Sequence, residues 1–167
     1  MFKRLPSHAN RSSGQTLYGL RIASGALQLA IAKPDPDAEG CFDVSFDQIE
    51  APSSDNWLSD DESGSLRTAI AGLAARHNMR DQQIAVSLDG DYCVTRIFVG
   101  SPEQIDLHLE EVDQQVQRYL QLGPGRKAIG TAQMGIGEDT HYAIVAVAQE
   151  RLINQIYEAF LEEDIDA

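Results

Sequence analysis

The chain has 167 residues, of which 43% are hydrophobic, and this is enough for one compact domain or for two small subdomains that share a core. Its net charge of -13 at pH 7 argues against a nucleic-acid partner, because binding to phosphates is driven by Lys and Arg. The same charge disfavours direct contact with an anionic membrane surface.

The cysteines and the N-terminal segment indicate the cellular compartment. Cys41 and Cys93 lie far apart, without a Cys-x-x-Cys spacing and without an export signal, so we expect a reduced, cytoplasmic protein. Residues 1–15 are basic but lack the apolar run of a signal peptide, and we expect them to form a flexible segment. No later stretch has the length of a membrane span, so direct membrane insertion is not expected.

The first predicted element is a hairpin. Residues 16–22 and 27–33 have strand character and flank a turn of small residues at 23–26. Gly25 in this turn is expected to adopt the positive φ of a tight hairpin. The sheet therefore begins with two antiparallel strands.

A third strand and an acidic loop are predicted next. Residues 41–49 alternate between apolar and polar side chains, which is typical of a strand with one buried face. The apolar positions are Phe42, Val44 and Phe46. Residues 51–65 are polar, acidic and rich in Ser, so we expect a mobile loop. We expect its Trp57 to pack against the sheet; the alternative is an exposed docking anchor.

A helix is predicted from residue 66. Leu66, Ile70, Leu73 and His77 are spaced so that they form one apolar stripe, and Ser65 is available as the N-cap. We expect His77 to close the helix near the negative end of its dipole rather than to bind a ligand.

A strand pair and a long helix follow. Residues 83–88 and 92–99 are rich in β-branched and aromatic residues and flank the Asp-Gly turn at 89–90. Residues 101–104, Ser-Pro-Glu-Gln, combine an N-cap, a proline at the first helical position and a capping-box glutamine. The Gly-Pro-Gly at 123–125 ends the helix through a left-handed glycine and a missing amide donor. Its apolar face consists of Ile105, Leu109, Val112, Val116 and Tyr119.

The last elements are a second hairpin and a helix. Residues 127–134 and 140–148 flank a glycine-containing turn, and the second strand is apolar enough to be central and buried on both faces. Residues 151–163 place apolar side chains at helical spacing. The predicted order is β-β-β-α-β followed by β-α-β-β-α, an α/β protein with mixed sheets.

This succession of segments resembles a known family. The segments are YGLRIASGALQL, IAVSLDGDYCVTRIFV, EEVDQQVQRYLQLGP, KAIGTAQMG, HYAIVAVAQE and RLINQIYEAF. Their order and approximate spacing are similar to those of the type IV pilus assembly protein PilM family and, more distantly, of the cell-division actin-like protein FtsA. The resemblance covers most of the chain and rests on the succession rather than on any one segment.

The resemblance implies half of an actin-like, RNase H-like fold. Residues 16–90 correspond to the first actin-like subdomain, and residues 91–167 to a small inserted α/β subdomain. In the family a second half follows and supplies a second phosphate loop and the adenosine pocket. Nothing in this chain corresponds to that half, so we expect either part of a longer protein or a reduced form.

The resemblance also places the phosphate turn of the family, and its chemistry is altered here. Arg21 stands where the family has an aspartate, Ala23 where it has the first loop glycine, and Gln28 where it has a lysine or similar residue. Such an aspartate helps to hold the metal that bridges phosphate oxygens, whereas a guanidinium repels a cation and has no lone pair to donate. We therefore expect no catalytic residue, no metal and no cofactor. The vestigial phosphate loop consists of Arg21, Ala23, Ser24, Gly25 and Ala26.

Two hypotheses describe this turn. In the first, Arg21 contacts a phosphate directly, assisted by Ser24 and the Gly25 amide in a backbone nest, so that a nucleotide binds without hydrolysis. In the second, the turn is a plain hairpin in which Arg21 pairs with a carboxylate. We favour the second, because acidic residues are abundant and short Gly/Ser turns recur in proteins that bind nothing there.

Other candidate chemistry is explained by local structure. The four histidines show no metal-ligand spacing and form no recognisable catalytic set. They are His8, His77, His108 and His141. Asp89, Asp91 and the acidic run at 60–62 are candidates for acid-base work or metal binding, but turn chemistry and a solvated loop account for them.

The resemblance implies a scaffold rather than an enzyme. PilM-like proteins are cytoplasmic and hold the short cytoplasmic tail of a membrane-anchored partner. We expect a non-catalytic adaptor of a type IV pilus or related secretion machine, recruited to the inner membrane through that partner; a basic, extended tail suits the negative charge. One alternative is the nucleotide-binding half of an actin-like ATPase, with ATP as its cofactor. Another is a homo-oligomerisation module that uses the long helix, if Leu107 and Val116 are exposed.

Overall fold

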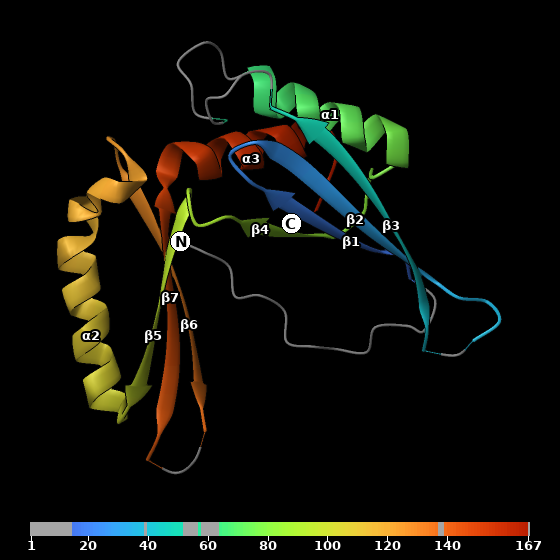
Figure 1. The fold of residues 1–167 in the computed structure, drawn as a ribbon. Helices are drawn as coiled ribbons and strands as arrows, with labels where there is room; N and C mark the ends of the chain where they lie inside the picture. The colour runs from blue at the N-terminus through green and yellow to red at the C-terminus, as the bar shows by residue number, and fades with distance from the viewer. Residues whose placement is uncertain (1–14, 39, 52–56, 58–63, 137–138, 167) are drawn as a thin grey trace.

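The structure, a computed structural model, describes residues 15–38, 40–51, 57, 64–136 and 139–166. Its elements follow the predicted order (Figure 1). The strands are β1 Leu17–Ile22, β2 Ala26–Pro34, β3 Phe42–Glu50, β4 Ile84–Leu88, β5 Cys93–Gly100, β6 Lys127–Gly135 and β7 His141–Gln149. The helices are α1 Gly64–His77, α2 Pro102–Gln115 and α3 Glu150–Glu162, with short 3-10 turns at η1 Val116–Arg118 and η2 Leu120–Leu122. Residues 1–14 of the predicted segment 1–15, and residues 52–56 and 58–63 of the predicted loop 51–65, lie outside the described residues.

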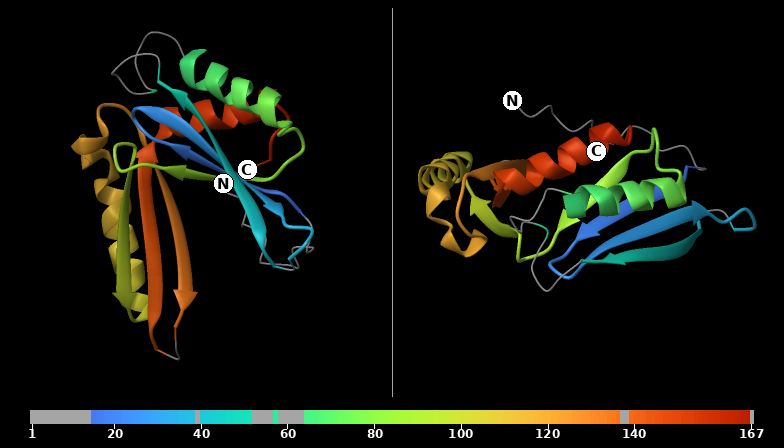
Figure 2. Two further views of the ribbon diagram at one scale, coloured as in Figure 1. Left: turned by 45° about the vertical axis from the view of Figure 1, so that its right-hand side comes forward. Right: turned by 90° about the horizontal axis from the view of Figure 1, so that it is seen from above.

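Four strands form the first sheet, sheet A, in the order β3-β2-β1-β4. β4 runs parallel to β1, and the other neighbours are antiparallel, which confirms the predicted hairpin of β1 and β2 and places the predicted third strand beside β2. α1 and α3 lie together on one face of this sheet (Figure 2). The strand side chains that point toward these helices are buried, because the two helices together cover that face. They include Leu20, Ile22, Leu27, Leu29 and Ile84.

Helix α3 belongs to the core of sheet A, although it directly follows β7 of the second sheet. Its residues Leu152, Ile156 and Phe160 are buried in the same cluster as Leu20 and Ile70. The sequence predicted this helix but assigned it to the small inserted subdomain of residues 91–167, and that assignment of α3 is wrong. The apolar stripe of α3 packs beside α1, a long-range contact that helical spacing does not reveal.

After α3 the chain returns to the edge of β4. The amide of Ile84 donates to the carbonyl oxygen of Asp166 at 2.8 Å, and the amide of Asp166 donates to the carbonyl oxygen of Gln82 at 3.0 Å. Gln83 and Asp166 thereby form a parallel bridge. The last described residues therefore tie the end of the chain to sheet A.

Three strands form the second sheet, sheet C, in the order β5-β7-β6. The central place predicted for β7 is confirmed. Its Ala143, Val145 and Val147 are buried, but Tyr142 and Ile144 on the other face are only half-buried, so the prediction of burial on both faces is wrong. α2 covers the buried face, whereas no helix of the described chain covers the other.

The long helix begins as predicted and then departs from regular α geometry. The Ser101 hydroxyl accepts from the Gln104 amide, and the Gln104 side chain accepts from the Ser101 amide, which confirms the capping box. Two 3-10 turns follow Gln115, and Gly123 has a φ of +76°. Leu107 is exposed but Val116 is buried, so the outward-facing pair considered for oligomerisation is not formed.

Strand β3 presents the opposite face from the one predicted. Phe42, Val44 and Phe46 are exposed, Phe46 to 78%, on the side of sheet A that no described helix covers. The polar side of β3 faces α1 instead. Asp47 Oδ2 lies 2.6 Å from His77 Nε2 and 3.0 Å from Arg76 Nη1. The predicted alternation is confirmed, but the burial of its apolar side is wrong, because polar pairs bind this edge strand to the helix.

The start of α1 also differs from the prediction. The helix begins at Gly64, so Ser65 lies inside the first turn and is not the N-cap. The end of α1 agrees with the prediction, because His77 is the last helical residue. The His77 side chain pairs with Asp47. No helix in the described part of the chain is long and apolar enough to cross a membrane.

Candidate functional site

The predicted phosphate turn connects β1 to β2. The amides of Ala23 and Ala26 donate to each other's carbonyl oxygens at 3.0 and 3.4 Å, so Ser24 and Gly25 form a two-residue turn. Gly25 does not have a positive φ, and the prediction that it does is wrong. An anion-binding nest needs right-handed and left-handed residues in succession. The backbone of this turn therefore lacks that shape.

Trp57 supports the turn through a hydrogen bond to Ala23. It is 3% exposed, and its indole Nε1 donates to the carbonyl oxygen of Ala23 at 2.7 Å. Its amide donates to the hydroxyl oxygen of Tyr92 at 3.0 Å, and burial raises the pKa of that hydroxyl. The prediction that Trp57 packs against the sheet is confirmed, and the exposed docking anchor is wrong.

Arg21 lies at the end of β1, beside the end of the parallel strand β4. Its Nη2 lies 2.9 Å from Asp89 Oδ2, and its Nη1 donates to Gln28 Oε1 at 3.1 Å. The predicted pairing with a carboxylate is confirmed. Contact with a phosphate stays a hypothesis, and the guanidinium would have to exchange at least one of these partners to make it.

The other predicted candidates are dispersed over the described chain. His77 pairs with Asp47, and this hydrogen bond is the main cause that lowers the pKa of Asp47. His108 stacks on Phe98 with ring centroids 4.8 Å apart. Among the described residues no group of three or more His, Cys, Asp or Glu side chains is placed to hold a metal ion. His8 and the acidic run at 60–62 lie outside the described residues.

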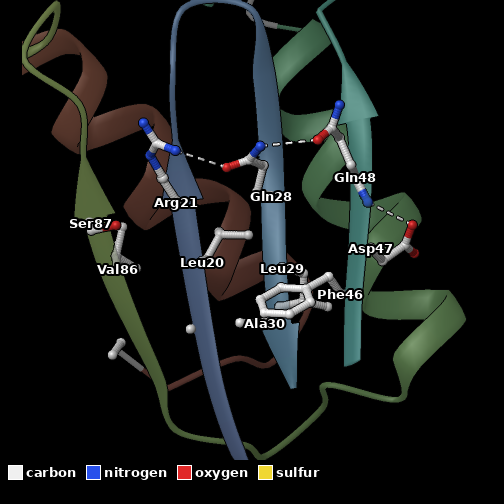
Figure 3. Close-up of a pocket in the computed structure, with 12 residues that line it drawn as sticks. Leu20, Arg21, Gln28, Leu29, Ala30, Phe46, Asp47, Gln48, Val86 and Ser87 are labelled. Atoms are coloured by element: carbon white, nitrogen blue, oxygen red, sulfur yellow. Dashed lines mark hydrogen bonds between the residues drawn. The ribbon is translucent and has the colours of Figure 1, made fainter. Parts of the chain in front are cut away.

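The uncovered face of sheet A carries a hollow of about 790 Å³ (Figure 3). Its floor is a row of small residues from three adjacent strands, Ala85, Gly19 and Ala30, which are paired in register. Phe46, the register partner of Ala30 on β3, extends over β2 and closes one end. Small side chains beside an exposed aromatic ring give the hollow an apolar floor and wall.

A row of hydrogen-bonded side chains borders the hollow on one side. Arg21 donates to Gln28, and Gln28 Nε2 donates to Gln48 Oε1 at 3.0 Å (Figure 3). Gln48 donates in turn to Glu50. Asp89 accepts from Arg21 at the other end. This amide ladder therefore crosses sheet A between two carboxylates and presents both donors and acceptors to the hollow.

The uncovered face of sheet C has a different chemistry. The side chains that alternate onto it are Cys93, Thr95, Ile97, Val99, Ala128, Gly130, Ala132, Met134, Tyr142, Ile144, Ala146 and Ala148. All twelve are uncharged, and Ile97, Val99 and Met134 are each at least 60% exposed. This face is apolar, but it lacks the row of polar side chains that borders the hollow on sheet A.

The sequence did not identify the hollow. Its signal was present in the alternation of β3, which placed Phe46 on one face with Phe42 and Val44. Alternation does not say which face the helices cover, and the apolar side was assigned to the core. Gln28 was considered only as a replaced residue of the phosphate turn, although the structure places it at the centre of the amide ladder.

Comparison with known proteins identifies solved structures with a similar fold but no similar sequence. No protein-family model matches the chain, and no curated protein is significantly similar to it in sequence. Among solved structures, PilM of a PilM-PilN type IV pilus biogenesis complex is similar over 90% of this chain and 45% of that chain, with 17% identity and a TM-score of 0.59. The cytoplasmic domain of EpsL, an inner membrane component of the type II secretion system of Vibrio cholerae, is similar over 91% of this chain and 53% of that chain, with 9% identity and a TM-score of 0.50.

The chain thus spans about half the length of each of these two proteins. At such identities the likeness concerns the fold, and it confirms the predicted actin-like α/β class and the structural resemblance to PilM. Both similar proteins are named as parts of pilus or secretion machinery.

Proposed function

We propose that this chain is a non-catalytic, cytoplasmic scaffold of a type IV pilus or related secretion machine, and that it holds the cytoplasmic tail of an inner-membrane protein. The observation that carries the proposal is the likeness to PilM over 90% of the chain, since that PilM structure is described as a complex with PilN. Fold alone does not fix function, so the site must agree with the proposal.

The chemistry at the ends of β1 and β4 supports a role without catalysis. Ligands of α/β sheets commonly bind outside the carboxyl ends of parallel strands. At this position the chain places the Arg21 guanidinium against Asp89. Phosphoryl transfer needs a metal ion to bridge the phosphate oxygens, and a positive side chain already paired with the nearby carboxylate disfavours that ion.

The exposed apolar surface supports a binding role. Phe46, Ile97, Val99 and Met134 are all at least 60% exposed, on the uncovered faces of the two sheets. Large apolar side chains that are exposed together on a sheet face are common at interaction sites of soluble proteins. A scaffold that is covered by its partner accounts for this exposed apolar surface.

Calorimetric titration tests the proposal. The full chain is titrated with a synthetic peptide that has the sequence of the cytoplasmic tail of a bitopic inner-membrane protein from the same organism, and separately with magnesium-ATP. We expect saturable binding of the tail and neither binding nor turnover of ATP. A tail that does not bind at high micromolar concentration, or measurable ATP hydrolysis by the purified chain, would contradict the proposal.

A further inference from the structure

The two sheets have separate cores. The buried cluster of sheet A contains residues of its own strands and of α1 and α3, whereas the buried cluster of sheet C contains residues of α2, of the segment that follows it and of β7. Sheet C also extends away from sheet A in the views of Figure 1 and Figure 2. The position of sheet C therefore depends on the few segments that join it to sheet A.

The described chain passes between the sheets at two crossings. The first is residues 89–92, which lead from β4 to β5, and the second is the step from Gln149, the last residue of β7, to Glu150, the first residue of α3. Cys93 and Ala148 are paired in register, so both crossings lie at the same end of sheet C. β5 has eight residues, and a strand of this length spans about 27 Å. A small rotation at the crossings therefore moves the far end of sheet C by a large distance.

The second crossing forms a fixed pivot. The Glu150 amide donates to the carbonyl oxygen of Arg126 at 3.0 Å, and the two side chains form an ion pair at 3.1 Å. The ammonium group of Lys127, which is 8% exposed, donates to the carbonyl oxygens of Gly123 and Gly125 at 2.7 and 2.6 Å. These bonds hold the loop before β6 against the start of α3. One pivot does not prevent rotation, so a second fixed point is needed to set the angle between the sheets.

Trp57 supplies that second point at the first crossing. Tyr92, the residue before β5, is 2% exposed in the buried cluster of sheet A, and its hydroxyl oxygen accepts from the Trp57 amide at 3.0 Å. The indole Nε1 of Trp57 donates to the carbonyl oxygen of Ala23, in the turn between β1 and β2, at 2.7 Å. The crossing itself is tied to the same end of sheet A, because the Asp89 amide donates to the carbonyl oxygen of Ile22 at 2.9 Å. Trp57 thus links the turn to the residue that precedes sheet C.

We propose that Trp57 is a latch that couples the β1–β2 turn to the angle between the two sheets. With the indole in its site, both crossings are fixed and sheet C is held in one position. With Trp57 displaced, Tyr92 loses its link to the turn and sheet C rotates about the second crossing, as in a hinge formed by a few residues at the ends of elements. A molecule that breaks the Ala23 bond at the turn would move sheet C without touching it. This role does not depend on the proposed function.

The distance between two spin labels tests the latch. One label is placed on the native Cys41, which is exposed next to β3 of sheet A. The other is placed at Met134→Cys, 65% exposed near the far end of sheet C, with Cys93→Ser removing the second native thiol. A rotation of about 10° moves the end of a strand of about 27 Å by about 5 Å. Double electron–electron resonance resolves such a change.

We expect one narrow distance distribution when Trp57 is present and a broad distribution or a second distance in Trp57→Ala. The matched control is Leu73→Ala, because Leu73 is 0% exposed in the same buried cluster but belongs to α1 and not to a crossing. This control opens a cavity in the core and should keep the narrow distribution. An unchanged distribution in Trp57→Ala would overturn the proposal. Equal broadening in Leu73→Ala would also overturn it, since the movement would then follow from lost stability alone.

A second pair of variants decides the question if Trp57→Ala does not fold. Trp57→Phe keeps an aromatic ring and removes the bond to Ala23, and Tyr92→Phe keeps its ring and removes the acceptor of the Trp57 amide. Each should broaden the distribution, and the double variant should broaden it more than either. A double variant with the narrow distribution of the original chain would overturn the proposal.

Fluorescence gives an independent readout, because Trp57 is the only Trp in the chain. In Tyr92→Phe the indole emission should shift to longer wavelength, and acrylamide should quench it more strongly than in Leu73→Ala. The emission of a buried indole in both variants would show that Tyr92 does not hold Trp57 in its site, and this would contradict the latch.

Discussion

In each of the two sheets, helices of the described chain cover one face and leave the other uncovered. The two sheets differ in how far along the sequence their covering helices lie. Sheet C is covered by α2, which follows β5 after one residue. Sheet A is covered by α1 and by α3. α3 follows all three strands of sheet C in the sequence. The core of sheet A therefore depends on contacts between distant segments, whereas sheet C is continuous in sequence.

The uncovered faces differ as well. On sheet A, five side chains from Asp89 to Glu50 are joined by hydrogen bonds beside a hollow, and these bonds fix their positions. On sheet C the exposed side chains are uncharged and, apart from Thr95, apolar, so they can increase affinity but orient a ligand poorly. Fixed polar groups provide orientation and specificity, and the uncovered face of sheet C has no such row.

The largest expected effect tests whether α3 belongs to sheet A. Phe160 is 2% exposed within the core cluster, and Phe160→Ala should lower the free energy of unfolding by about 3–5 kcal/mol, because it leaves a cavity. Denaturant unfolding measures the loss. Hydrogen exchange should then show reduced protection in β1, β2 and α1 before β7.

The control for this variant is Tyr157→Ala on the exposed side of the same helix. Tyr157 is 63% exposed, so its replacement should change the free energy of unfolding by no more than about 0.5 kcal/mol. If Phe160→Ala loosened sheet C and left sheet A protected, the difference between the two sheets described above would be wrong.

A smaller effect is expected at the turn between β1 and β2. Trp57→Phe keeps an aromatic ring but removes the Nε1 donor, so the half-buried carbonyl oxygen of Ala23 keeps only the 3.4 Å bond from the Ala26 amide. The loss of one hydrogen bond costs about 0.5–1.5 kcal/mol. Thermal or denaturant unfolding measures this loss. A variant as stable as the original chain would show that Trp57 does not support the end of sheet A.

The edge of sheet A is expected to depend on pH. The hydrogen bond from His77, together with the charge of Arg76, lowers the pKa of Asp47. A lowered folded-state pKa adds stability above the ordinary aspartate value of about 3.9, and this stability is lost as pH falls through the folded-state pKa. Asp47→Asn should therefore lower the free energy of unfolding near neutral pH and leave it almost unchanged in strong acid.

Urea unfolding of the original chain and Asp47→Asn across this pH range measures the difference. In a His77→Ala background the same substitution should show a weaker pH dependence, because the main cause of the shift has been removed. A difference that grows as the pH is lowered would contradict the role assigned to this pair in holding β3 against α1.

The smallest effect is expected on the uncovered face. Arg21 and Asp89 have side chains that are 52% and 40% exposed, and an exposed ion pair contributes less than about 1 kcal/mol. Arg21→Ala should therefore leave the thermal midpoint almost unchanged. A large loss of stability would show that the ladder supports the fold of sheet A and is not mainly a binding feature.

The order of elements could be predicted because its signals are local. Ser101 and Gln104 form the predicted capping box, Gly123 has the predicted left-handed φ, and β7 is central, as its apolar run indicated. Each of these depends on neighbours in sequence or on the composition of one segment. The resemblance of the whole succession to PilM was visible for the same reason.

The errors concern information that no single segment carries. The alternation in β3 gives two faces but not the one that α1 covers, and Asp47 reverses the expected choice by pairing with His77. The apolar stripe of α3 does not indicate which sheet the helix packs against. In the structure Phe160 packs in the core of sheet A, which is distant in sequence. The hollow needs Gly19, Ala30 and Ala85 from three strands in register, which only the folded sheet brings together.

The central claim is that the chain binds a membrane partner's tail and does not use the phosphate turn. Backbone amide chemical shifts of the isotope-labelled full chain, followed during separate titrations with the tail peptide and with magnesium-ATP, test it most directly. The account predicts saturable shifts with the peptide and none with magnesium-ATP at Ser24 and Gly25. Shifts at Ser24 and Gly25 with magnesium-ATP, together with an unperturbed spectrum in the presence of the tail, would contradict it.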